Sequence, residues 1–183
     1  MVRSAAHVAA AVDATEEGLV LLSNQQKALP FASSKATAVI GPLAAVRKTL
    51  IGNYFGQICP GLPETFNCVK TIRESVDGVL GTNSSYAAGC ANVPCDNDKG
   101  FKAAVAAATA AEQVVLTLGL DGTQEGEGHD RHSVVLPGMQ LQLAQAILKL
   151  KRPTVRTTLE LLLLLLQLLM VLLLPVLKSL SCR

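Results

Sequence analysis

The sequence is poor in aromatic and charged residues, and these shortages exclude several classes of protein. Among its 183 residues there is no tryptophan, and aromatic residues make up only 3%. Side chains that stack on bases are therefore scarce, and a net charge of +2 provides no basic surface for phosphate groups. Charged residues amount to 16%, against about 25% in an average soluble domain. The composition argues against nucleic-acid binding and against a disordered, highly charged chain.

The N-terminus lacks the apolar run that a secretory signal peptide needs. Asp13, Glu16 and Glu17 fall where such a leader would carry its hydrophobic segment and cleavage site. We therefore expect no signal peptide in the chain as written, and the sequence leaves the compartment open.

One segment is far more hydrophobic than the rest. Leucine occupies 14 of the 22 positions from Leu159 to Leu180. Leu161–Leu177 is interrupted only by Gln167 and Pro175, and its 17 residues are at the lower limit of the roughly 17–25 that cross a bilayer as a helix. We expect a Leu-rich helical tail over residues 156–183, which is either a membrane helix or a segment read in a shifted frame.

The rest of the chain predicts alternating helices and short buried strands. Apolar runs closed by a glycine predict strands at residues 36–40 and 113–118, and a weaker candidate lies at 85–87. Alanine-rich runs and apolar residues spaced three and four apart predict helices at 4–22, 43–51, 65–76, 100–112 and 139–151. This alternation favours an α/β fold with a mostly parallel sheet, whose functional loops leave the carboxyl ends of strands.

The loop after the 113–118 strand concentrates reactive side chains. Four carboxylates, a histidine and an arginine lie within Asp121–Arg131, interleaved with three glycines. A carboxylic acid in a partly desolvated site can act as a general acid, and glycine lets the backbone approach a ligand closely. Carboxylates and imidazoles also bind metal ions, and a charged loop is commonly just a solvated surface. The residue types alone leave these three interpretations open.

The cysteines are not arranged as a zinc site. None of them forms the CxxC pairs of a zinc ribbon, and we expect no structural metal. In an oxidising compartment Cys90 would pair with Cys95 and Cys59 with Cys68, leaving Cys182 unpaired. The alternative is a set of free, buried thiols.

Two smaller features complete the candidates. Asn83-Ser84-Ser85 is an N-glycosylation motif, which has meaning only in a secreted chain. His7 lies on the first predicted helix, where a single histidine is typically a packing or capping residue. Neither feature identifies a function on its own.

Short motifs follow one another along most of the chain in a recognisable order. They are EGLVLLSN (17–24) with Leu29-Pro30, AVIGP (38–42), IGNYFG (51–56), YAAGC (86–90), VVLTLGLD (114–121), QEGEGHDR (124–131) and LPGMQ (136–140). In this order they resemble the second, α/β-sandwich domain of glycoside hydrolase family 3, particularly its β-xylosidase-like and β-glucosidase-like members. The resemblance covers about residues 5–155 and implies a partial three-layer α/β/α sandwich with a mostly parallel sheet.

The resemblance implies retaining hydrolysis of a β-linked xyloside or glucoside without a cofactor. In this family a nucleophilic Asp lies on a preceding (β/α)8 barrel and a general acid/base Glu lies on this loop, and retention needs the two carboxyl groups about 5–5.5 Å apart. The first Glu of the family's Asp-x-x-x-Glu-x-Glu loop falls on Glu125, which we assign as the acid/base, with Glu127 as the alternate. Asp121, Asp130 and Arg131 are expected to bind substrate or to brace the loop, Asp130 and Arg131 through a charge-assisted pair.

The chain departs from the family pattern at both ends. No barrel precedes Met1, so we expect the nucleophile to be absent and cleavage by this chain alone to be negligible. After Val155 the family continues with a buried strand, whereas here Arg156-Thr157-Thr158 leads into the leucine tract. We therefore expect an incomplete domain at 1–155, a sheet that lacks at least one strand, and a separate tail at 156–183. Members of the family are usually secreted.

Two other interpretations remain open. The chain is either a non-catalytic α/β module attached to a membrane through Leu161–Leu177, or a degenerate fragment that does not fold stably. An open sheet edge and an exposed leucine run both promote aggregation, which is the physical basis of the second interpretation.

Overall fold

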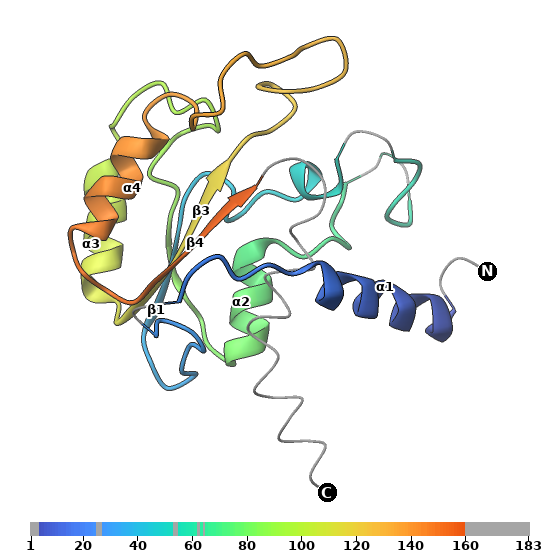
Figure 1. The fold of residues 1–183 in the computed structure, drawn as a ribbon, viewed down its shortest axis with the longest axis horizontal. Helices are drawn as coiled ribbons and strands as arrows, with labels where there is room; N and C mark the ends of the chain where they lie inside the picture. Colours follow the sequence, from blue (N-terminus) through green and yellow to red (C-terminus); the bar gives the residue numbers. More distant parts are fainter. Residues whose placement is uncertain (1–3, 25–26, 53–54, 62, 64, 160–183) are drawn as a thin grey trace, which may run out of the picture.

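A computed structural model describes residues 4–24, 27–52, 55–61, 63 and 65–159. The described chain forms one parallel sheet with helices packed around it (Figure 1). The elements are α1 Ala5–Gly18, β1 Thr37–Ile40, the 3₁₀ helix η1 Lys48–Ile51, α2 Ile72–Leu80, β2 Ser85–Ala87, α3 Phe101–Ala110, β3 Gln113–Gly119, α4 Gln140–Leu148 and β4 Thr154–Leu159.

The sheet has the strand order β2-β1-β3-β4, and every neighbouring pair of strands is parallel. Val39 of β1 lies in register with Tyr86 of β2 and with Val115 of β3, and Val115 in turn pairs with Val155 of β4. All residues of β1 and β3 are buried, as expected for parallel strands covered on both faces. The predicted α/β class with a parallel sheet is confirmed.

Helices cover both faces of the sheet (Figure 1). On one face, Ala104 of α3 and Leu143 of α4 belong to the same buried cluster as Leu116 of β3. On the other face, Val76 of α2 packs in a cluster with Val115. Val115 and Leu116 are consecutive, and successive side chains of a strand point to opposite faces. The alternation along β3 therefore separates the two halves of the core.

Helix α1 stands apart from this core. None of its residues is buried, and the side chain of Val8 is 54% exposed. The helix begins at an N-cap, because the Ser4 hydroxyl accepts a hydrogen bond from the backbone N–H of His7, whose ring also lies 3.0 Å from that hydroxyl. The predicted helix at 4–22 is confirmed over Ala5–Gly18, but its apolar side packs on no described part of the core.

Two predicted helices differ from the observed ones. Only Lys48–Ile51 of the segment 43–51 is helical, and the helix predicted at 65–76 begins at Ile72. The disulfide of Cys68 with Cys59 ties the preceding segment into a loop. A capping box then starts α2, in which Thr71 and Glu74 each accept a hydrogen bond from the other's backbone N–H.

Strand β4 crosses the boundary expected between domain and tail. We expected a helical tail to begin at residue 156, and over residues 156–159 this is wrong, because Thr154–Leu159 is a strand that pairs with β3 from Val114 to Gly119. A sheet ladder is made by backbone groups, and threonine favours the extended conformation, so a polar Arg156-Thr157-Thr158 sequence still forms a strand.

The leucine tract itself is outside the described residues, which end at 159. The helical or membrane-spanning character of Leu161–Leu177 therefore stays a prediction. Within the part of the chain that the structure describes, no helix is both long and apolar enough to cross a membrane.

Candidate functional site

The acidic loop leaves the carboxyl end of β3, an interior strand of the sheet. Gly119 ends the strand, and Asp121–Arg131 extends beyond its arrowhead (Figure 1). Parallel α/β sheets bind ligands at this edge. An open hollow of about 420 Å³ lies beside the start of the loop, and its lining residues are Lys48, Thr49, Gly52, Phe55, Asp121, Gly122 and Thr123.

Asp121 organises the beginning of the loop. Its Oδ1 accepts hydrogen bonds from the backbone N–H of Thr123 at 2.9 Å and from the Thr123 hydroxyl at 2.5 Å. Its carbonyl oxygen accepts from the N–H groups of Gln124 and Glu125. An aspartate that binds the backbone two residues further on forms an Asx turn. Asp121 thus braces the loop.

Glu127 lies at the tip of a tight turn. Gly126 and His129 exchange two backbone hydrogen bonds, of 3.0 and 2.9 Å. Gly128 has a φ of +73°, which suits glycine at the third position of a type II turn. The turn projects from the loop, and the side chain of Glu127 is exposed.

Glu125 lies at the base of that turn and is half-buried. Its Oε2 accepts a hydrogen bond of 2.8 Å from the backbone N–H of Arg131, which is on the far side of the turn. This bond closes the base of the turn and orients the carboxylate. The two glutamates singled out by the sequence therefore differ, because one is oriented by the loop and the other lies at its tip.

Arg131 braces the following segment through carbonyl oxygens. Its guanidinium donates to the carbonyls of Ser133 at 3.2 Å and Val135 at 2.7 Å, and to the Gln124 side-chain oxygen at 3.4 Å. The ion pairs among the described residues involve two other arginines, so the expected pair of Asp130 with Arg131 does not form. The Arg131 guanidinium instead donates to carbonyls that follow it in the chain, and Asp130 is exposed.

The base of the loop is held by Gln140, a residue to which the sequence assigned no role. Its side chain is completely buried. Its amide nitrogen donates to the carbonyls of Val93 at 2.5 Å and Gly119 at 2.9 Å, and its oxygen accepts from the N–H of Gly119 at 2.8 Å. Gln140 thus ties the end of β3 to α4 and to the 90–95 loop. The sequence does contain a signal for this role, because Gln140 is a polar residue on the apolar side of an amphipathic helix.

Both predicted disulfides are present, Cys90–Cys95 and Cys59–Cys68, so the alternative of free thiols is wrong for these four residues. Cys90 and Cys95 are buried in the same cluster as α3 and α4. The backbone N–H of Met139 donates to the Cys95 carbonyl. At Gly138 a Cβ atom would lie 2.0 Å from the carbonyl oxygen of Pro94, so only glycine permits this close contact. Cys182 is outside the described residues.

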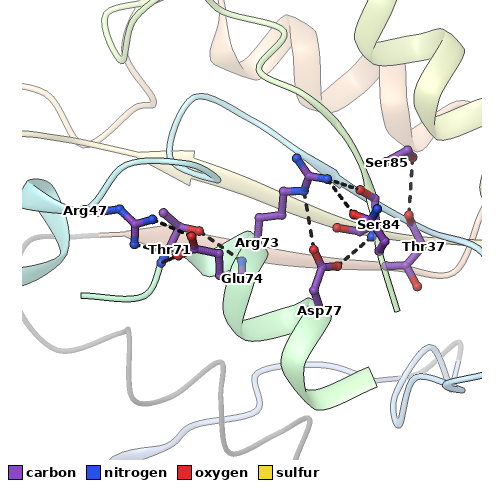
Figure 2. A network of polar contacts seen from close by, with 9 residues as sticks. Thr37, Arg47, Thr71, Arg73, Glu74, Asp77, Ser84 and Ser85 are labelled. Carbon is purple, nitrogen blue, oxygen red and sulfur yellow. Dashed lines mark hydrogen bonds and ion pairs between the residues drawn. The ribbon is translucent and has the colours of Figure 1, made fainter. Parts of the chain in front are cut away.

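A second polar cluster surrounds α2 (Figure 2). The Arg47 guanidinium binds both carboxylate oxygens of Glu74, at 2.7 and 2.5 Å, and also donates to the Val69 carbonyl. The hydrogen bonds from Arg47, and next that from the Thr71 N–H, lower the pKa of Glu74 to about 2. This cluster joins α2 to the segment that follows β1.

Histidine and acidic side chains of the loop do not form a metal site. Over the described residues, no three His, Cys, Asp or Glu side chains are grouped so that they could hold a metal ion.

The chain is similar to members of a glycosidase family over most of its length. The model for the glycosyl hydrolase family 3 C-terminal domain matches residues 19–162. Over 155 residues the chain is 43% identical to probable beta-D-xylosidase 7 of Arabidopsis thaliana. The match covers 83% of this chain and 19% of that protein. Over 154 residues it is 38% identical to probable exo-1,4-beta-xylosidase xlnD of Neosartorya fischeri, with 84% and 18% covered.

Solved structures agree with this assignment. A family 3 exo-beta-xylosidase in complex with a xylobiose aziridine activity-based probe superposes with a TM-score of 0.63 and 34% identity, covering 79% of this chain and 18% of the other. The fold is also shared with a beta-glucosidase from Listeria innocua in complex with isofagomine, at a TM-score of 0.66 and 24% identity over 86% and 20% of the two chains. This chain spans about a fifth of the curated relatives, 19% and 18% of their lengths. It belongs to the family of glycosyl hydrolase family 3 C-terminal domains.

Proposed function

We propose that this domain supplies the general acid/base for retaining hydrolysis of β-linked xylosides or glucosides, and that Glu125 is that residue. The observation that carries the proposal is the position of Glu125, half-buried on the loop that leaves β3 and oriented by the Arg131 N–H. The 43% identity with a probable β-xylosidase favours xylosides, and with them xylan-derived oligosaccharides, as substrates.

The chemistry requires a carboxyl group that is held in place. In retaining hydrolysis one carboxylic acid donates its proton to the glycosidic oxygen while a second carboxylate attacks the anomeric carbon; the first group then deprotonates the water that releases the sugar. A group that acts on both oxygens in turn must keep its position. The Gly126–His129 turn and the bond from Arg131 provide this constraint for Glu125, while Glu127 is the alternate at the exposed tip.

The nucleophile is expected on another part of the enzyme. The resemblance implies an Asp on a (β/α)8 barrel, which retaining chemistry requires about 5–5.5 Å from Glu125. We therefore expect the purified 183-residue chain to hydrolyse an aryl β-xyloside only negligibly. A measurable rate that disappears in Glu125→Gln would contradict this expectation.

A chimera tests the acid/base role. Residues 19–159 of this chain replace the matching segment of probable beta-D-xylosidase 7 of Arabidopsis thaliana, and hydrolysis of xylobiose and of an aryl β-xyloside is measured. We expect Glu125→Gln to lower kcat on xylobiose by about 10²–10⁴-fold, because proton transfer is lost. The loss should be smaller on the aryl xyloside, whose leaving group needs less protonation.

Glu127→Gln is the matched control, since it removes a carboxylate two positions away, and it should change kcat only a few-fold. A larger loss for Glu127→Gln than for Glu125→Gln would move the acid/base role to Glu127. An active chimera that tolerates both changes would remove the role from this loop.

A further inference from the structure

The Asn83-Ser84-Ser85 motif lies at the amino edge of the sheet. Ser85 is the first residue of β2 and pairs with Ala38 near the start of β1. The acidic loop, by contrast, follows the last residue of β3. Because all the strands are parallel, the motif and the acidic loop occupy opposite edges of the sheet.

The motif has an exposed asparagine beside a backbone that is hydrogen-bonded to α2. Asn83 and Ser85 are exposed, whereas Ser84 between them is buried. The N–H of Ser84 donates to the Asp77 carboxylate at 2.7 Å, and the Ser84 carbonyl accepts from Arg73 at 2.8 Å (Figure 2). Arg73 and Asp77 are themselves 3.6 Å apart on α2. These contacts hold the middle of the motif against α2 and leave its first residue at the surface.

The contact that Arg73 makes with Asn83 is compatible with modification of the side-chain amide. Arg73 donates to the Asn83 Oδ1 at 3.1 Å, so this bond uses the oxygen. An N-linked glycan is attached through the amide nitrogen. The same Oδ1 contact can therefore persist after a sugar is attached.

Two disulfides indicate the compartment in which such a modification occurs. Cys59–Cys68 and Cys90–Cys95 are both formed, and disulfides of this kind persist in secreted proteins and in the lumen of the endoplasmic reticulum. A secretory compartment is also where an Asn-x-Ser motif is glycosylated.

We propose that Asn83 carries an N-linked oligosaccharide at the amino edge of the sheet. The proposal is independent of the role of Glu125. β2 is the first strand in the sheet order, so its outer side pairs with no strand among the described residues. A bulky hydrophilic group beside an open edge opposes pairing with another chain. The glycan would thus oppose pairing of another chain along the outer side of β2, far from the acidic loop.

Translation of the full chain behind a cleavable secretion leader, with microsomes of the endoplasmic reticulum, tests the proposal without requiring a folded product. We expect one endoglycosidase-sensitive increase in mass for the natural chain. Ser85→Thr, which keeps the motif, and Asn92→Gln, which changes an exposed asparagine outside it, should show the same increase. Asn83→Gln and Ser85→Ala should show none.

Two results would overturn the proposal. One is an unmodified natural chain that is protease-protected inside microsomes that glycosylate a reference protein. The other is an increase in mass that survives Asn83→Gln. In the chimera, Asn83→Gln should leave kcat on the aryl xyloside unchanged. The proposal of a glycan and the proposal of an acid/base role can therefore be refuted independently.

Discussion

Charged side chains gather in two regions, around α2 and in the loop after β3, and the two regions bind their carboxylates differently. Beside α2, Glu74 is paired with Arg47 at 2.5 Å. In the loop, Asp121 and Glu125 accept hydrogen bonds from neutral backbone and hydroxyl donors. The Glu74 carboxylate uses both of its oxygens in the contact with Arg47, whereas the Glu125 carboxylate is oriented by one backbone N–H that binds one of its oxygens. The partners of a carboxylate, more than its presence, separate a structural role from a chemical one.

Of the substitutions, we expect Gln140→Leu to have the largest effect, and to affect the loop after β3 more than the cluster around α2. This change leaves the N–H of Gly119 and two carbonyls unpaired in a buried site, and each such group costs about 1–3 kcal/mol. We expect the free energy of unfolding to fall by at least about 2 kcal/mol. Amide hydrogen exchange should accelerate in residues 119–131 more than in α2.

Gln142→Leu is the matched control for Gln140→Leu, because Gln142 lies on the same helix and is exposed. Its effect on the free energy of unfolding should be small. Equal destabilisation by the two changes would show that Gln140 does not anchor the loop.

Removing the disulfides one at a time tests whether the acidic loop and the segment before α2 are anchored separately. In the loop-entropy description, closing a loop of this size stabilises the chain by about 2 kcal/mol, and each paired Cys→Ala variant should lose roughly that amount. Loss of Cys90–Cys95 should accelerate hydrogen exchange at the base of the acidic loop, because Met139 binds the Cys95 carbonyl. Loss of Cys59–Cys68 should instead accelerate exchange in the segment before α2. Identical exchange patterns would contradict two separately anchored regions.

The smallest expected effect is that of Glu74→Gln, which keeps a capping side chain but removes the charge. The ion pair is partly exposed, so we expect a loss of under about 1 kcal/mol at pH 7. The pKa of Glu74 is lowered from 4.5 to about 2, so its stabilisation is present above pH 4.5 and is lost as the pH falls towards 2. Denaturation of both proteins across this range should show their difference shrinking with acid. A constant difference would exclude the charge as its cause.

The sequence predicted the parts of the fold that depend on local patterns. Apolar runs located β1 and β3, and alanine-rich periodicity located α3, within one or two residues. No strand was predicted at 154–159, because its polar residues do not show an apolar run and the strand forms by pairing with β3. Register and strand order are defined by pairing between segments far apart in the sequence, such as Ala38 with Ser85 and with Val114.

The candidate site was predicted in the same uneven way. Simple spacing predicted the disulfide partners correctly. The assignment of Glu125 from the family resemblance stays a prediction, and its orientation by the Arg131 N–H depends on how the turn folds back. Gln140 was missed because a glutamine in an amphipathic helix predicts a surface position. Only the packing of α4 against the end of β3 shows that its three hydrogen bonds are internal.

The order of the strands has a consequence for synthesis of the chain on the ribosome. Ala38 of β1 pairs with Ser85 and Val114, both of which are made much later, and Val114 is flanked on its other side by Thr154. Pairing between distant segments must first overcome the entropy of closing the chain between them. β1 is therefore synthesised well before the strands that pair with it, and its apolar residues stay uncovered until then. β3 gains its second neighbour only when β4 has been made. A nascent chain stopped before residue 154 would leave β3 without its neighbour β4, and unpaired apolar strands of this kind are prone to aggregate.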